Sequence, residues 1–335
     1  MKIMKNILRG ILAAALMLSS VSCIQAILKT DELIADKDLP SGVLPSEDMT
    51  YGSAAAEDFS AHAARYSIDA TADTPYASIE LFGDGTYLIT KTGYQSVYGR
   101  KATKGYEDSY YIAGGYTVEQ EGHYSLEDFG TLKVQEEGDG FNLVFDNTYG
   151  NRLSTVFATK DPVLTDDASK SLCRTWDLNT QEEWMYLGSS LIINTKYTGG
   201  DKPTIEGKVG VDSEELEESI DGMCKQMRFS PAGTYYCVYN DGSVRVSTWE
   251  WGNAEQGILF FDWQKGEQDE GYVTVRFSGK QMRTYEDYTF DIMSFIEEDM
   301  EDDEEDASAY IEILEKFAGD SKLRYLIVNS LEVAD

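Results

Sequence analysis

Basic residues are scarce in this chain of 335 residues, which holds 28 lysines and arginines against 60 aspartates and glutamates. The net charge of -32 repels nucleic-acid phosphates and anionic lipid headgroups alike, so nucleic acid is not an expected partner. Proline is rare too, with six residues, and the 29 glycines argue against a collagen-like or wholly disordered chain. The length leaves room for a removable leader, a tail and two domains of ordinary size.

The sequence also lacks the familiar catalytic motifs: it has no GxSxG nucleophile elbow, no HExxH zinc motif and no glycine-rich phosphate loop. Only two histidines occur, and we interpret His62 and His123 as surface residues rather than general bases. A carboxylate-dependent hydrolase is the weakest of our hypotheses, because 60 acidic residues make some close pair in space almost inevitable. We therefore predict a protein that is not an enzyme, with no catalytic residue, no cofactor and no metal site.

The four cysteines contain no CxxC spacing, which would suggest redox chemistry or a zinc site. Besides Cys23, an odd number remains: Cys173, Cys224 and Cys237. They are either small buried hydrophobic residues or one disulfide with one free thiol, and the sequence favours the first interpretation.

The first 23 residues have the pattern of an export signal. A basic start is followed by an apolar stretch over residues 11–18, too short to span a bilayer, and by the small-residue cleavage site Ser20-Val21-Ser22-Cys23. A cysteine directly after such a site resembles a bacterial lipobox, which implies that residues 1–22 are removed and that Cys23 carries diacylglycerol. The alternative is an ordinary signal peptide cut nearby. Ile24 follows instead of Asp, so the resemblance implies a lipid anchor in the outer membrane.

Residues 23–71 show no strong periodicity, and we predict a flexible tether that includes a possible short helix over Ala54–Arg65. An N-terminal β domain is expected over residues 72–160. A short polar bridge leads to a second domain over residues 168–335, which contains the acidic segment 297–306.

The strongest local signal is a hairpin in the second domain. Two runs of β-branched and aromatic residues, Gly233–Tyr239 and Ser243–Trp251, flank Asn240-Asp241-Gly242, whose residues tolerate the positive φ of a tight turn. The triplet Gly233-Thr234-Tyr235 has an echo in Gly85-Thr86-Tyr87, 148 residues earlier. We therefore predict two related β domains in tandem.

Many short strands separated by turn residues are typical of an antiparallel sandwich or barrel, so the predicted class is mainly β. The strands expected in the first domain are Ala77–Leu81, Tyr87–Lys91, Tyr116–Glu119, His123–Leu126, Thr131–Gln135, Phe141–Phe145 and Leu153–Ala158. Beyond the hairpin, those expected in the second are Cys173–Leu178, Ser190–Lys196, Ile258–Trp263, Tyr272–Phe277, Gln281–Tyr285 and Leu323–Val328, the last of which would close the sheet.

One or two helices are added to the second domain. Apolar residues fall on one face of a helix that Asp212 caps, namely Leu216, Ile220, Met223 and Met227. A second amphipathic helix is predicted over Tyr310–Phe317, after the acidic segment. That segment has no glycine for a calcium-binding turn, and we interpret it as solvated.

Two groups of residues are candidates for ligand binding. A long loop over residues 93–115 is rich in tyrosine and locally basic, and its candidates are Tyr94, Tyr98, Arg100, Lys101, Lys104 and Tyr106. The same loop is about as well explained as an adaptable surface loop with no ligand. The second group, Trp249, Trp251 and Trp263, would form a stacking platform or line a barrel, but the pattern favours the core of the second domain.

Trp176, a following strand and helix, and the run FSPAGTYYCVYNDGS resemble the lipocalin-like domains of exported lipoproteins from Bacteroidetes. The similarity covers residues 172–290, and the first domain shares only its Gly-Thr-Tyr triplet. Arg174 stands two residues before Trp176, where a lipocalin has the glycine that lets the tryptophan ring close the barrel floor.

Our leading hypothesis is a non-catalytic lipoprotein of the cell envelope that binds a small apolar molecule, a glycan or an envelope partner. The alternative is a structural subunit of a surface assembly, joined by strand addition at an unpaired sheet edge. The sequence predicts neither the oligomeric state nor the ligand.

Overall fold

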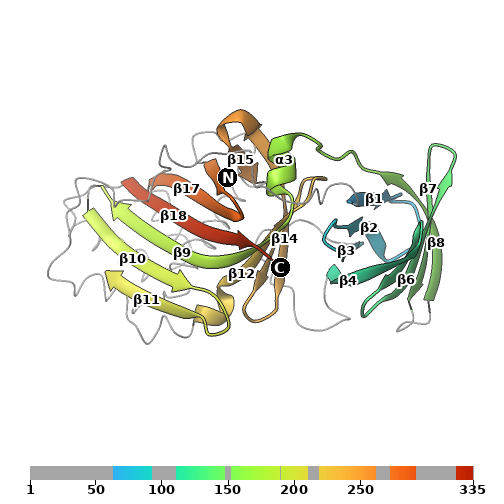
Figure 1. The fold of residues 1–335 in the computed structure, drawn as a ribbon, viewed down its shortest axis with the longest axis horizontal. Coiled ribbons are helices and arrows are strands. Elements are labelled where there is room, and N and C mark those ends of the chain that lie inside the picture. The colour runs from blue at the N-terminus through green and yellow to red at the C-terminus, as the bar shows by residue number, and fades with distance from the viewer. Residues whose placement is uncertain are drawn as a thin grey trace, which may run out of the picture.

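The computed structural model describes residues 63–92, 111–147, 152–188, 190–209, 219–261, 272–291 and 322–334. These residues are mostly β-structure and form two closed antiparallel barrels of eight strands in tandem, which lie next to each other along the long axis of the molecule (Figure 1). The predicted fold class is confirmed, and both domains are barrels rather than sandwiches. Within the described ranges, no helix has the length and apolar character needed to cross a membrane.

The first barrel is a simple meander in which each strand pairs with the next and β1 pairs with β8. Its strands are β1 (Ala64–Ile68), β2 (Tyr76–Leu81), β3 (Thr86–Lys91), β4 (Tyr111–Gln120), β5 (His123–Leu126), β6 (Gly130–Glu137), β7 (Gly140–Asn147) and β8 (Arg152–Lys160). Alternate side chains of the strands fill the interior, among them Ile79, Tyr87 and Phe145, together with Phe129 from the turn between β5 and β6, and all four are fully buried.

The strand β1 lies inside the segment that the sequence led us to predict as a tether with a short helix. That interpretation is wrong for residues 64–68, where Ala64, Tyr66 and Ile68 alternate inward as buried residues. Five residues give too short a period-two pattern to stand out, and the strand exists because it pairs with both β2 and β8.

The second domain begins with the helix α3 (Asp167–Leu172). Ten strands follow: β9 (Thr175–Leu187), β10 (Ser190–Thr198), β11 (Thr204–Val209), β12 (Cys224–Phe229), β13 (Thr234–Tyr239), β14 (Val244–Asn253), β15 (Ile258–Phe261), β16 (Tyr272–Ser278), β17 (Gln281–Asp291) and β18 (Lys322–Val333). Eight of them, β9 and β12 to β18, close the barrel. Two short 3-10 helices, η2 (Ile220–Gly222) and η3 (Ala254–Gln256), lie between strands. The predicted closure by the last strand is confirmed, because β18 pairs with β17 on one side and β9 on the other.

The long strand β9 has two partners along its other edge. Its first residues pair with β12, whereas its later residues pair with β10, which carries β11 as an outer hairpin strand. β11 therefore ends the sheet order and is an edge strand in the described part of the chain.

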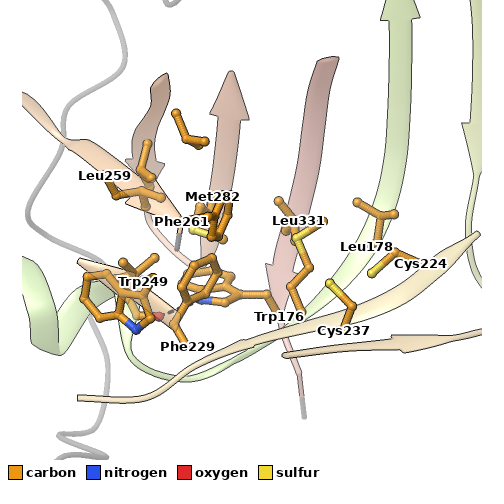
Figure 2. Close-up of a cluster of buried hydrophobic side chains, with 14 of the residues drawn as sticks. Trp176, Leu178, Cys224, Phe229, Cys237, Trp249, Leu259, Phe261, Met282 and Leu331 are labelled. Carbon is orange, nitrogen blue, oxygen red and sulfur yellow. Dashed lines mark hydrogen bonds between the residues drawn. The ribbon is translucent and has the colours of Figure 1, made fainter. Parts of the chain in front are cut away.

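An aromatic core fills one part of the second barrel, where Trp176, Phe229, Trp249 and Phe261 pack together (Figure 2). Cys173, Cys224 and Cys237 are buried in this core with free thiols, in line with small hydrophobic residues rather than a disulfide. The guanidinium of Arg174 lies 5.6 Å from the centre of the Trp176 ring and donates to the carbonyl of Lys170. The barrel therefore closes without a glycine at position 174.

The helix predicted over residues 212–227 is wrong at its C-terminal end. Cys224–Phe229 is the strand β12, and the described residues just before it are the helical Ser219 and the 3-10 turn η2. Met223 and Met227 fit a helical face by spacing, but pairing of β12 with both β9 and β13 outweighs that local preference. The acidic segment 297–306 and the helix predicted over 310–317 lie outside the described residues.

The polar bridge between the domains is also different from the prediction, because α3 forms there and Cys173 ends it instead of beginning a strand. Asp166 caps the helix by accepting a hydrogen bond from the backbone N–H of Ser169 at 2.8 Å. The indole of Trp176 donates to the carbonyl of Leu172, so the helix is attached to the start of β9.

The Gly-Thr-Tyr echo is a repeat in three dimensions. Gly85 and Gly233 both have positive φ, 82° and 85°, in turns that carry the same backbone hydrogen bonds. In each domain an aromatic side chain on the strand after this hairpin donates to the carbonyl at the start of the turn. Tyr116 of β4 donates to Phe82, and Trp249 of β14 donates to Ser230. The strand trios β2–β3–β4 and β12–β13–β14 are thus equivalent.

Candidate functional site

Most of the predicted site residues lie outside the described part of the chain. This applies to the lipidation candidate Cys23, to Trp263, and to the loop candidates Tyr94, Tyr98, Arg100, Lys101, Lys104 and Tyr106. His62 also falls outside it, whereas His123 begins β5 and its ring lies 2.6 Å from the amide of Gln120.

Trp249 and Trp251 are brought together, with ring centres 5.4 Å apart. Trp249 is 2% exposed and its indole donates to the carbonyl of Ser230, so it belongs to the core. Trp251 is partly buried, and its indole donates to the hydroxyl of Ser169 in α3 at 2.9 Å. Both rings serve the packing of the barrel rather than an open stacking platform.

A polar region faces the interior of the second barrel beyond this aromatic core. Met282 on β17 and Leu331 on β18 belong to the core, and side chains alternate along a strand, so Glu286 points inward as well. Ile327 on β18 lies opposite Glu286 on one side and Glu183 of β9 on the other. Two strand spacings place the α-carbons of the two glutamates about 10 Å apart, with their side chains on the same inner surface.

Both glutamates are held by hydrogen bonds. Glu286 accepts from the hydroxyl of Tyr288 at 2.6 Å and from the amide of Asn329 at 3.2 Å. Burial, and to a lesser degree the charge of Glu183, raises the pKa of Glu286 to about 7. Glu183 accepts from the amide of Gln181 at 2.5 Å, and burial raises the pKa of its carboxyl too.

The two glutamates differ in how far the residue is exposed. Glu183 is 8% exposed, whereas Glu286 and Ile327 keep an intermediate exposure although they face the interior. Asn329 is 1% exposed, and its Oδ1 has no hydrogen-bond partner among the described residues. A buried polar cluster that is not fully satisfied costs stability, which is expected of a functional surface rather than of a structural one.

The shared direction of the two pKa shifts limits the chemistry of the pair. A hydrolytic carboxylate pair needs one group that stays ionised and one whose pKa is raised, but burial raises the pKa of both Glu183 and Glu286. Within the described residues, no group of three or more histidines, cysteines and acidic residues is placed to hold a metal ion. The arrangement is suited to accepting or donating hydrogen bonds to a ligand.

Sequence reasoning missed Glu183 and Glu286. Both lie in strands rich in acidic residues, where inward and outward positions look alike. The one available signal is the alternation that follows from Met282 through Thr284 to Glu286, and it becomes informative only when Met282 is known to face the core.

A second polar cluster joins the two barrels. Arg228 of β12 is 6% exposed and forms an ion pair with Asp84 at 3.2 Å, while its Nε donates to the hydroxyl of Thr175 at 2.5 Å. Its guanidinium also lies 5.1 Å from the centre of the Phe82 ring and 4.9 Å from that of Tyr236. The outer faces of the equivalent strand trios thus pack against each other.

No protein-family model matches the sequence, and no curated protein matches it. Among solved structures, the chain is similar to a protein of unknown function from the DUF3598 family of Nostoc punctiforme PCC 73102. The two are 9% identical, the match covers 81% of this chain and 93% of the other, and the TM-score is 0.18. Similarity at this level carries no weight for function, for which the geometry is the guide.

Proposed function

We propose that this protein is a non-catalytic binding protein of the bacterial cell envelope, tethered to the outer membrane through a lipid on Cys23. Its ligand is a small, mainly apolar molecule with a hydrogen-bonding group, taken into the second barrel. The observation that supports this most directly is Glu286, an inward-facing residue of intermediate exposure whose carboxyl pKa is raised to about 7 by burial.

The surroundings of Glu286 fit such a ligand. Ile327 beside it offers apolar surface that is partly exposed inside the barrel, and Tyr235 on β13 is also only partly buried. A ligand that covers this surface gains from apolar burial, while one polar group pairs with Glu286 and fixes its orientation.

Binding of N-phenyl-1-naphthylamine, an apolar fluorophore with a single N–H donor, tests the proposal. We expect a saturable rise in fluorescence with the purified protein, because the probe leaves water for the barrel interior. Ile327→Trp places a large ring between the two glutamates and should weaken binding at least tenfold. Val118→Trp, on the exposed outer face of β4, is the matched control and should bind like the wild type.

Circular dichroism of the two variants separates a blocked barrel from an unfolded one. Absence of saturable binding by the wild type, or equal binding by a folded Ile327→Trp variant, would remove the barrel interior as the ligand site.

The structural alternative has one observation in its favour, the edge strand β11 (Thr204–Val209). Its outer edge pairs with no other strand among the described residues and is suited to strand addition by a second chain. Size-exclusion chromatography of the purified ectodomain distinguishes the two functions, since a strict monomer at high protein concentration contradicts assembly through β11.

A further inference from the structure

A pocket of about 100 Å³ opens between the outer faces of the two barrels. The first barrel contributes Glu80, Leu88, Thr90 and Tyr111 to its wall, and the second contributes Val246 and Thr248. This volume is roughly eight times the least that holds one water molecule, so it admits a group of several heavy atoms. Clefts between domains are common places for small-molecule sites.

The walls of this pocket are held in place by contacts between the barrels. Arg65 of β1 donates from Nη1 to the hydroxyl of Thr234 at 3.1 Å, and Ser230 donates to the carboxyl of Glu80. The buried ion pair of Arg228 and Asp84 lies on the same interface. A ligand therefore meets a surface that is already formed and loses little affinity to ordering it.

The charged groups of the pocket are largely neutralised. Arg65 is paired through Nε with Asp161 at 3.3 Å. Glu80 is 4% exposed, and burial raises the pKa of its carboxyl, which favours the uncharged form. Neither a strong anion nor a strong cation finds an unpaired opposite charge on this wall, and the net charge of -32 further disfavours anions.

The remaining chemistry of the wall is hydroxyl groups beside apolar surface. Thr90, Thr234 and Thr248 supply hydroxyls, and Tyr111 supplies a ring face. Leu88 and Val246 supply apolar surface between them. A ligand that matches this wall is small, uncharged, rich in hydroxyl groups and apolar on one face.

We propose that the pocket between the barrels binds a single neutral sugar ring. The apolar face of the ring lies against Tyr111, Leu88 and Val246, and its hydroxyls pair with Thr90, Thr248 and the carboxyl of Glu80. This site is separate from the interior of the second barrel and does not depend on the function proposed above.

Saturation-transfer NMR of the full ectodomain with glucose, galactose, mannose and N-acetylglucosamine tests the inference. We expect saturable transfer to at least one of these sugars and weaker transfer to glucuronate and glucosamine, which carry a charge. No saturable transfer to any neutral sugar, or stronger binding of either charged sugar than of glucose, overturns the proposal.

Thr248→Phe tests whether the sugar binds in this pocket, because the new ring at this exposed position on the wall projects into the pocket. We expect at least a tenfold loss of sugar binding and unchanged binding of N-phenyl-1-naphthylamine. Thr117→Phe on β4, an exposed strand threonine away from the pocket, is the matched control. Thr90→Val, which keeps shape and removes one hydroxyl, should weaken sugar binding about fivefold. Equal sugar binding by the wild type and Thr248→Phe contradicts the location.

Discussion

Replacing Glu286 by glutamine should remove a pH-dependent loss of stability from the second barrel. In the wild type, burial raises the pKa of this carboxyl from 4.5 to about 7. The folded protein therefore holds a proton there that the unfolded chain releases at lower pH. Glutamine has nearly the same shape and is neutral at every pH.

The sign and size of the effect follow from proton linkage. Between the two pKa values the folded state binds more protons than the unfolded state, so the free energy of unfolding falls as the pH rises. Because the pKa is raised from 4.5 to about 7, an increase in pH from about 5 to about 8 lowers the unfolding free energy by about 2.5 kcal/mol. This is an upper value, because the intermediate exposure of Glu286 lets solvent screen part of its charge. The wild type loses this stability over that interval, and Glu286→Gln does not.

Urea denaturation followed by tryptophan fluorescence measures this change. All five tryptophans lie in the second domain, so their emission reports on that barrel alone. The quantity to compare is the difference in unfolding free energy between variant and wild type at each pH, in which the titration of the other acidic groups largely cancels. Working above about pH 5 avoids the isoelectric point near 4.3.

Glu206→Gln is the matched control, since this exposed glutamate of β11 also removes one negative charge. We expect it to change stability by less than about 0.5 kcal/mol at either pH. If the difference in unfolding free energy between Glu286→Gln and the wild type is the same at about pH 5 and at about pH 8, burial does not keep Glu286 protonated.

Three further predictions concern the junction, the repeat and the anchor. Arg228→Met leaves Asp84 without its ion-pair partner and should lower the unfolding free energy by about 3 kcal/mol in urea. The double variant with Asp84→Asn should lose less, and an equal or larger loss contradicts the pairing. Gly233→Ala should cost about 1–2 kcal/mol, because φ is 85° there, whereas Gly222→Ala, with open space around its α-carbon, should be nearly neutral in the same assay. Cys23→Ala should move the protein from the membrane to the soluble fraction, and a wild-type mass without acyl chains refutes the anchor.

The sequence indicated the role of the tryptophans but not that of the glutamates inside the second barrel. The tryptophan pattern favoured core over a binding platform, and the burial and hydrogen bonds of Trp249 agree with the core interpretation. The two glutamates of the second barrel were lost among 60 acidic residues, because composition and spacing do not distinguish inward from outward positions. Their significance depends on the faces that β9 and β17 present to the core.

The helix predicted over residues 212–227 shows where local pattern fails. Met223 and Met227 are four apart, which suits a helix, but β12 is bounded on both sides by strands that supply its backbone hydrogen bonds. The strand β1 was missed for the opposite reason, since its five residues carry too little pattern to be recognised alone.

The hairpin at residues 240–242, most of the strand positions and the relation between the two domains were predictable from the amino-acid sequence. These features depend on turn residues and on alternation between neighbours, which act over a few residues. The three-dimensional fold was needed to show that the first sheet closes through β1 with β8, that Glu286 faces the interior of the second barrel and that Thr248 lines a pocket between the barrels. Those features arise from pairings between strands far apart in the chain, whose register decides which side chains meet.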